Sequence, residues 1–125
     1  DSVGYLSDLT KKLKLDKTIV SLFFLDSFDV NWKYPYQSSA HHLKELTAIN
    51  RILHKDSLVV VDDSPATGNL TQNDGNANEP WKVLAEPSPS PTIGGKGFLV
   101  HEYAAHVGAK LLFSHYQAGW CQFNK

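Results

Sequence analysis

Three aspartates directly follow two short apolar segments of the chain. Asp26 closes the run TIVSLFFL at 18–25, and Asp62 and Asp63 close the run SLVVV at 57–61. Ligands bind beyond the carboxyl ends of strands in an open parallel sheet, so these carboxylates should converge if both runs are neighbouring strands. Clustered carboxylates repel one another, so they are tolerated mainly where a cation neutralises them or one group stays protonated. Hard oxygen ligands favour Mg²⁺, Mn²⁺ or Ca²⁺ over zinc. The spacing therefore raises the hypothesis of a divalent-metal site.

The same three residues also fit a plainer interpretation. Aspartate is common at strand ends and in turns, where its side chain caps neighbouring backbone amides. Exposed carboxylates usually serve solubility alone. Spacing alone leaves both interpretations open.

His42 is a candidate catalytic group. It lies four residues before Leu46, so it extends the apolar stripe of a predicted helix that begins at Ser38 or Ser39 and ends near His54. The amino end of that helix should lie at the carboxyl edge of the sheet. A histidine there, with a pKa near neutrality, could take a proton from a substrate hydroxyl. A hydrogen-bonded structural histidine is an equal alternative.

Two other patterns carry less chemistry. His101, Glu102 and His106 have the spacing H-E-x-x-x-H, which turns the two imidazoles about 140° apart on a helix and excludes a zinc protease of the H-E-x-x-H type. The sequence GGKG at 94–97 precedes a predicted helix but lacks the spacing of a phosphate-binding P-loop. We expect a mobile hinge or a simple loop there.

The elements that would position these residues alternate along the chain. Apolar periodicity predicts helices at 2–15, 38–54 and 96–107, strands at 18–25 and 57–61, and a hairpin of strands at 110–115 and 119–123. The first strand is apolar almost throughout, which is typical of a central strand covered on both faces. The stretch at 64–97 is rich in Asn, Gly, Pro and Ser, and predicts a flexible loop, a lid or a binding loop.

Composition narrows the class of protein. The 125 residues are 42% hydrophobic, carry a formal net charge of −1 and include a single cysteine, Cys121. One α/β domain over 1–125 is expected, because a chain of this length buries one modest core. The dispersed charge argues against nucleic acid as a partner, and the absence of a long apolar run or a signal-peptide pattern predicts a cytoplasmic protein away from membranes.

Five segments, in order, resemble a known family. They are LFFLDSFDVNW, SSAHHLKELTAINRIL, SLVVVDDSP, GGKGFLVHEY and LLFSHYQ. Together they look like the second half of class I S-adenosylmethionine-dependent methyltransferases, particularly metal-dependent O-methyltransferases similar to macrocin O-methyltransferase. The resemblance covers nearly the whole chain outside 67–90. It implies a Rossmann-like half-domain with a mainly parallel sheet, flanking helices and a carboxyl-terminal antiparallel hairpin.

The resemblance also implies roles for individual residues. Asp26, Asp62 and Asp63 would hold Mg²⁺ beside the methyl group of S-adenosylmethionine, and the reaction would methylate the hydroxyl of a small molecule. Asp1 and Ser2 resemble an acid-serine pair that contacts the cofactor adenine in the family. The family's glycine-rich loop and its ribose-binding acid have no counterpart in these residues.

Two functions from other classes remain open. The first is a noncatalytic half-domain that serves as a binding or dimerisation module, because an open strand edge at 19–25 would favour pairing with a second copy. The second is a metal-dependent hydrolase built on the same carboxylates, since a fold does not fix its chemistry.

Overall fold

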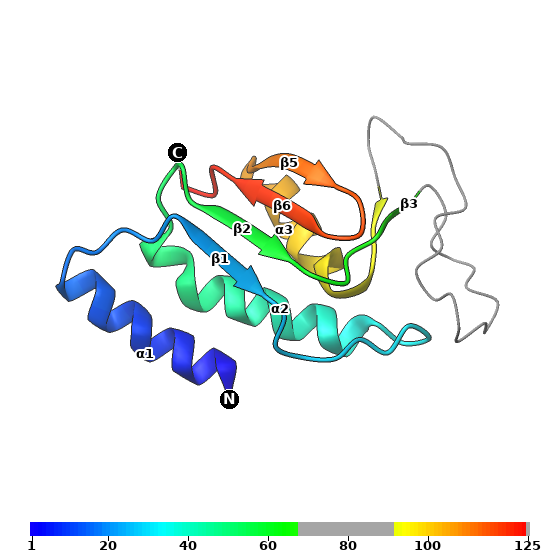
Figure 1. Cartoon of the computed structure of the whole chain (residues 1–125), viewed down its shortest axis with the longest axis horizontal. Helices are drawn as coiled ribbons and strands as arrows, with labels where there is room; N and C mark the ends of the chain where they lie inside the picture. The colour runs from blue at the N-terminus through cyan, green and yellow to red at the C-terminus, as the bar shows by residue number, and fades with distance from the viewer. Residues whose placement is uncertain (68–91, 125) are drawn as a thin grey trace.

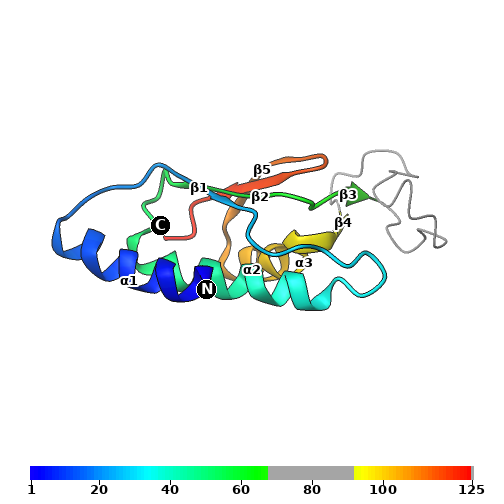
Figure 2. The same cartoon turned by 60° about the horizontal axis from the view of Figure 1, so that its bottom comes forward.

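The computed structural model of the protein describes residues 1–67 and 92–124. Its centre is a four-stranded sheet in the order β1-β2-β6-β5, formed by Leu22–Leu25, Leu58–Val61, Ala118–Cys121 and Lys110–Ser114 respectively (Figure 1). The helices are α1 at Ser2–Leu15, α2 at Tyr36–Ile49 and α3 at Phe98–Val107. Figure 2 shows that all three lie on the same side of the sheet, so the described chain forms two layers.

The sheet is mixed. β1 pairs with β2 in parallel, with Leu25 opposite Val61, whereas β6 pairs antiparallel with both β2 and β5. β1, β2 and β5 therefore run in one direction and β6 runs against them. The predicted α/β class and the terminal hairpin are confirmed. The prediction of a mainly parallel sheet is wrong, since only the pairing of β1 with β2 is parallel. The reason is that β6, the second strand of the hairpin, lies beside β2 in place of β5.

β1 differs from the strand predicted at 18–25. It is shorter, and it lies at an edge of the sheet among the described strands. Phe23 and Leu25 are buried against the helices, whereas Leu22 and Phe24 are 53% and 51% exposed. Successive side chains of a strand point to opposite faces, and no described helix covers the second face. The prediction of a central strand covered on both faces is therefore wrong.

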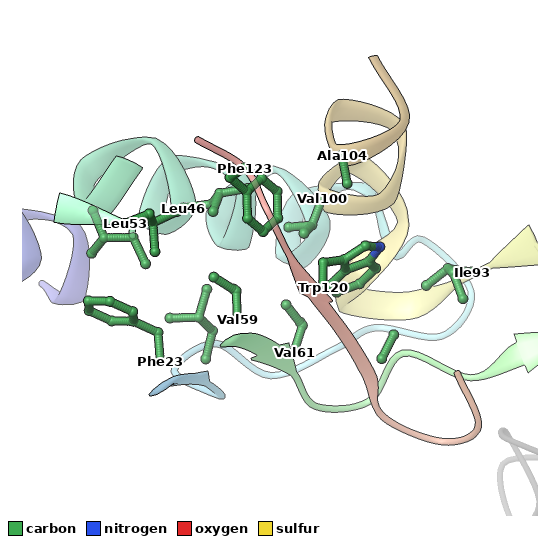
Figure 3. Close-up of a cluster of buried hydrophobic side chains, with 13 residues drawn as sticks. Phe23, Leu46, Leu53, Val59, Val61, Ile93, Val100, Ala104, Trp120 and Phe123 are labelled. Atoms are coloured by element: carbon green, nitrogen blue, oxygen red, sulfur yellow. The ribbon is translucent and has the colours of Figure 1, made fainter. Parts of the chain in front are cut away.

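The core fills the space between the sheet and the helices. Its members come from both layers, and those labelled in Figure 3 are Phe23, Leu46, Leu53, Val59, Val61, Ile93, Val100, Ala104, Trp120 and Phe123. The β-branched valines of β2 suit a pleated, buried strand, and the stripe of α2 meets them. Trp120 is fully buried, and its indole Nε1 donates a hydrogen bond to His101 Nδ1 at 3.3 Å.

The helix ends depart from prediction by a few residues. α2 begins earlier than its predicted serine caps, because Pro35 already has φ −75° and occupies the N-cap position. The Ser39 hydroxyl instead accepts a hydrogen bond from the backbone amide of Leu99 at 2.7 Å, and so satisfies the first turn of α3. α3 ends at Gly108, which adopts the left-handed conformation with φ 71° as predicted for a helix stop.

The ends of the segment 64–97 are ordered structure. β3 at Ala66–Thr67 and β4 at Thr92–Ile93 pair antiparallel, and a 3₁₀ turn, η3 at Gly95–Gly97, leads into α3. Every residue from 93 to 97 is buried. The stretch predicted as a loop therefore contains two short strands and a 3₁₀ turn at its ends, its flexibility stays a prediction, and the rest of it falls outside the described residues. Among the described residues, no helix combines the length and apolar character needed to cross a membrane.

Candidate functional site

The structure brings Asp26, Asp62 and Asp63 together beyond the carboxyl ends of β1 and β2. One carboxylate oxygen from each lies within 4.8 Å of the others. The cause is the parallel register: the backbone amide of Asp62 donates to the carbonyl of Leu25 at 3.2 Å, so both strands end at the same level. The convergence follows the strand spacing in the sequence, while a metal-binding role for the three residues stays a prediction.

Lys96 contacts two of these carboxylates, and sequence reasoning missed it. Its ammonium Nζ lies 2.6 Å from Asp26 Oδ1 and 2.9 Å from Asp63 Oδ2, and its side chain is only 2% exposed. Burial alone would lower the pKa of Lys96, but its hydrogen bonds to the two aspartates outweigh burial and raise that pKa above the ordinary value. The lysine therefore stays charged and forms part of the cluster.

Lys96 reaches the aspartates because its turn is docked against theirs. The backbone amide of Lys96 donates to the carbonyl of Asp63 at 3.0 Å. Gly95 has φ 57°, and a Cβ there would overlap the Asp63 carbonyl oxygen and lie 3.1 Å from the Trp32 ring. A Cβ on Gly97 would lie 2.6 Å from Ser64 Oγ. Glycine at both positions lets the turn pack directly against Asp63 and Ser64. The glycines of GGKG are thus the only local sequence feature that indicates close backbone packing here.

The hairpin between β5 and β6 holds the other side of the cluster. The Tyr116 hydroxyl donates to Asp63 Oδ1, and Gln117 Nε2 donates to Asp62 Oδ1 at 3.1 Å. Burial would raise the pKa of Asp63, but hydrogen bonds from Tyr116 and Lys96 more than offset it and hold that pKa below its ordinary value. Burial and the Asp63 carboxylate raise the pKa of Tyr116 well above its usual range.

The arrangement retains capacity for a divalent cation. Three carboxylates and one ammonium have a formal charge of −3 + 1 = −2. Oδ2 of Asp26 and Oδ2 of Asp62 accept no hydrogen bond from the described residues, and the Asp26 side chain is 45% exposed. Carboxylate oxygens are the ligands that Mg²⁺ and Mn²⁺ prefer. The residues present therefore fit such an ion, and the plainer capping role also occurs, since the amide of Asp63 donates to Asp62 Oδ1 at 2.9 Å.

His42 is placed differently from a substrate-facing base. Its side chain is 0% exposed, and Nδ1 donates to the carbonyl of Ser38 at 2.7 Å. Nε2 has no hydrogen-bond partner among the described residues and lies 3.7 Å from Glu45 Oε2. Burial lowers the pKa of His42 below its ordinary value. The imidazole is thus neutral near pH 7 and enclosed, and a catalytic role for it stays a prediction.

Asp1 and Ser2 have separate surroundings. The Asp1 carboxylate caps α1 by accepting a hydrogen bond from a backbone amide of its first turn at 3.0 Å. The Ser2 hydroxyl donates to Ser27 Oγ at 3.1 Å and lies 2.8 Å from His41 Nε2. Because Ser27 follows Asp26 in the chain, Ser2 lies at the same edge of the sheet as the carboxylates. Cofactor binding by either residue stays a prediction.

Glu45 links this serine pair to α2 and was also missed. Its side chain is 2% exposed, and Oε1 accepts a hydrogen bond from Ser27 Oγ. His41 Nε2 lies 3.6 Å from the same oxygen. Glu45 follows His41 and His42 by four and three residues, and this helical spacing is the sequence signal for its contacts with the two histidines.

The described residues therefore gather a carboxylate cluster with its own lysine, and a serine pair beside it, at one end of the sheet. Comparison of the chain with models of known protein families, with curated proteins and with solved structures finds no significant match.

Proposed function

We propose that this chain contributes the metal and acceptor side of a S-adenosylmethionine-dependent O-methyltransferase site of Rossmann-like type. The observation that carries the proposal is the convergence of Asp26, Asp62 and Asp63 within 4.8 Å at the carboxyl edge of a parallel strand pair. This is the edge where open α/β sheets bind ligands. The position of Ser2 beside Ser27 adds support, because it brings the residue proposed to touch the cofactor to that same edge.

In this proposal, Asp26, Asp62 and Asp63 hold the divalent cation. When bound, the cation would lower the pKa of an acceptor hydroxyl and neutralise charge near it. S-adenosylmethionine would supply the methyl group. Methyl transfer is a direct displacement, so positioning supplies much of the acceleration. The chain provides that positioning through Tyr116 and Gln117, whose hydrogen bonds fix the orientations of Asp63 and Asp62.

The proposal is tested by calorimetric titration of the chain with S-adenosylhomocysteine, with and without Mg²⁺. We expect binding that tightens when Mg²⁺ is present. Asp62→Asn should weaken Mg²⁺ binding while leaving the fold intact or more stable, because it relieves repulsion between carboxylates. Asp56→Asn is the matched control, since this carboxylate is 74% exposed and outside the cluster.

Two results would contradict the proposal. One is a chain that binds neither Mg²⁺ nor S-adenosylhomocysteine under any of these conditions. The other is unchanged Mg²⁺ affinity in Asp62→Asn, which would remove Asp62 from the ligand set.

A second candidate is a noncatalytic module that assembles through β1. The observation that favours it is the edge position of β1 among the described strands, together with the half-exposed side chains of Leu22 and Phe24 in that strand. Edge strands with apolar side chains pair readily with other chains. Sedimentation equilibrium should then detect a dimer that Phe24→Lys abolishes and that Phe98→Lys, on α3, preserves. A monomer at every concentration would exclude this function.

A further inference from the structure

Lys96 is a lysine in an unusual place. Lysine side chains are almost never fully buried unless they are paired, and this one is 2% exposed between two aspartates that follow different strands. We infer that Lys96 is a positioning residue that acts as the internal counter-cation of the site, holding Asp26 and Asp63 side by side and limiting how tightly a divalent cation binds. This inference rests on the proposed function, because Lys96 would regulate the metal site of that function.

The first step is that Lys96 and a divalent ion would share carboxylates of the same cluster. The ammonium takes Oδ1 of Asp26 and Oδ2 of Asp63 at 2.6 and 2.9 Å, and Tyr116 takes the second oxygen of Asp63. Among the described residues, this leaves Oδ2 of Asp26 and of Asp62 without a hydrogen-bond donor. An ion held by Asp26, Asp62 and Asp63 would share two of these carboxylates with the lysine, so the two cations would lie close together and repel.

The second step is that the ammonium is held in place by the backbone. The Lys96 amide is bonded to the Asp63 carbonyl, and Gly95 and Gly97 pack against Asp63 and Ser64 with no room for a Cβ. The neighbouring residues from 93 to 97 are all buried. The docked turn, the burial of the side chain and its two ion pairs together hold the ammonium beside the carboxylates, so its charge would act on a bound metal.

The third step concerns magnitude. A unit charge a few ångströms from a divalent ion interacts with it by more than the thermal energy even in a partly solvated site. Neutralising Lys96 also removes the ion pairs that order Asp26 and Asp63. This loss of order offsets part of the expected gain in affinity for the cation. We expect the net effect of neutralising Lys96 to be a rise of about tenfold or more in affinity for a divalent cation.

The experiment compares Mn²⁺ binding to the wild-type chain, Lys96→Met and Lys11→Met, by calorimetry and by electron paramagnetic resonance. Methionine keeps an unbranched side chain that is one heavy atom shorter, and removes the charge. Lys11, whose side chain is 77% exposed in α1, serves as the control for a generic loss of charge. Thermal unfolding of each protein is recorded with and without Mn²⁺.

We expect Lys96→Met to unfold at a lower temperature than wild type without Mn²⁺, to bind Mn²⁺ at least about tenfold tighter, and to gain more stability from it. A purely structural lysine would lower stability without raising the affinity. Equal or weaker Mn²⁺ binding by Lys96→Met would overturn the inference and leave the proposed function standing. Binding by Lys96→Met alone would support the inference and contradict the proposed function. Binding by neither protein would overturn both.

A second measurement applies if Lys96→Met does not fold. The ¹⁵Nζ resonance of Lys96 is followed in the wild-type chain during a Mg²⁺ titration, because a buried ammonium bonded to two carboxylates exchanges its protons slowly. We expect the signal to persist and to shift as Mg²⁺ binds. Loss of the signal, or an unchanged shift at saturating Mg²⁺, would overturn the inference.

Discussion

Gly95→Ala tests whether the turn that carries Lys96 docks as described. Gly95 has φ 57°, a conformation that costs an L-residue about 1–2 kcal/mol relative to glycine. The new Cβ would also overlap the carbonyl oxygen of Asp63, which belongs to the backbone and cannot rotate away. Relief of that overlap stretches the hydrogen bond from Lys96 N to Asp63 O, which contributes about 1 kcal/mol. The expected destabilisation is at least about 2–3 kcal/mol.

Urea unfolding measures this loss, with Gly4→Ala as the matched control. A Cβ on Gly4 meets only Asp1 Oδ2, at 3.8 Å, and alanine in a helix is favoured over glycine by about 0.5–1 kcal/mol. With a slope of about 2 kcal/mol per molar urea, Gly95→Ala should lower the midpoint by more than about 1 M. Gly4→Ala should raise it slightly. The same substitution gives opposite signs because only one site has a positive φ and an obstructing carbonyl.

The reasoning is refuted if Gly95→Ala unfolds within about 0.5 kcal/mol of wild type, the range of ordinary surface changes. That result would mean that the turn is not packed on Asp63. A loss of stability in Gly4→Ala as large as that in Gly95→Ala would show that the effect is not local.

Three further predictions concern pH and helix capping. Burial lowers the pKa of His42 below 6.5, so its contribution to the free energy of unfolding should be complete above pH 6.5. That free energy should fall at lower pH, where the unfolded chain takes up a proton at this histidine and the folded chain does not. His42→Asn should flatten this decline, and His106→Asn, at an exposed position, should leave it unchanged. Asp63 has a pKa held below 3.8, so its stabilising contribution should be present above that pH and disappear in more acidic solution, and Asp63→Asn should remove it. Ser39→Ala should cost about 1 kcal/mol in urea unfolding, because the Leu99 amide loses its acceptor.

Each of these has a contrary outcome. A pH profile of stability that is identical in wild type and His42→Asn would show that the imidazole is not enclosed in solution. If Asp63→Asn leaves acid unfolding unchanged, Lys96 and Tyr116 do not stabilise the charged form of Asp63 in solution. Ser39→Ala with wild-type stability would show that water replaces the hydroxyl at the start of α3.

Local patterns predicted most of the elements. α1 was predicted at its observed bounds, and Gly108 was predicted as the stop of α3, because apolar periodicity and helix-stop glycines act within a few residues. The error over β1 has a different origin. The run at 18–25 is apolar enough for a strand covered on both faces, but whether a second layer covers Leu22 and Phe24 depends on where distant helices pack. That information is not local to the strand.

The candidate site was predicted only where local patterns place its residues. Asp26, Asp62 and Asp63 were found because each follows a strand, and parallel pairing then brings them together. Lys96 was missed because its contact with Asp26 spans 70 residues and depends on a turn that the glycine pattern only permits. Glu45 was missed because its partner Ser27 is defined by how α2 crosses the end of β1.

Lys96 also bears on the plainer interpretation of the aspartates. A cluster of strand-end acids with no ligand has to be neutralised from within or exposed to water. Among the described residues, only Lys96 forms an ion pair with the cluster, so two of its three negative charges are unmatched. Asp26 is half-exposed, but Asp62 and Asp63 are partly buried, where water screens charge less. One divalent cation would balance this unmatched negative charge, and this balance supports the proposed metal site.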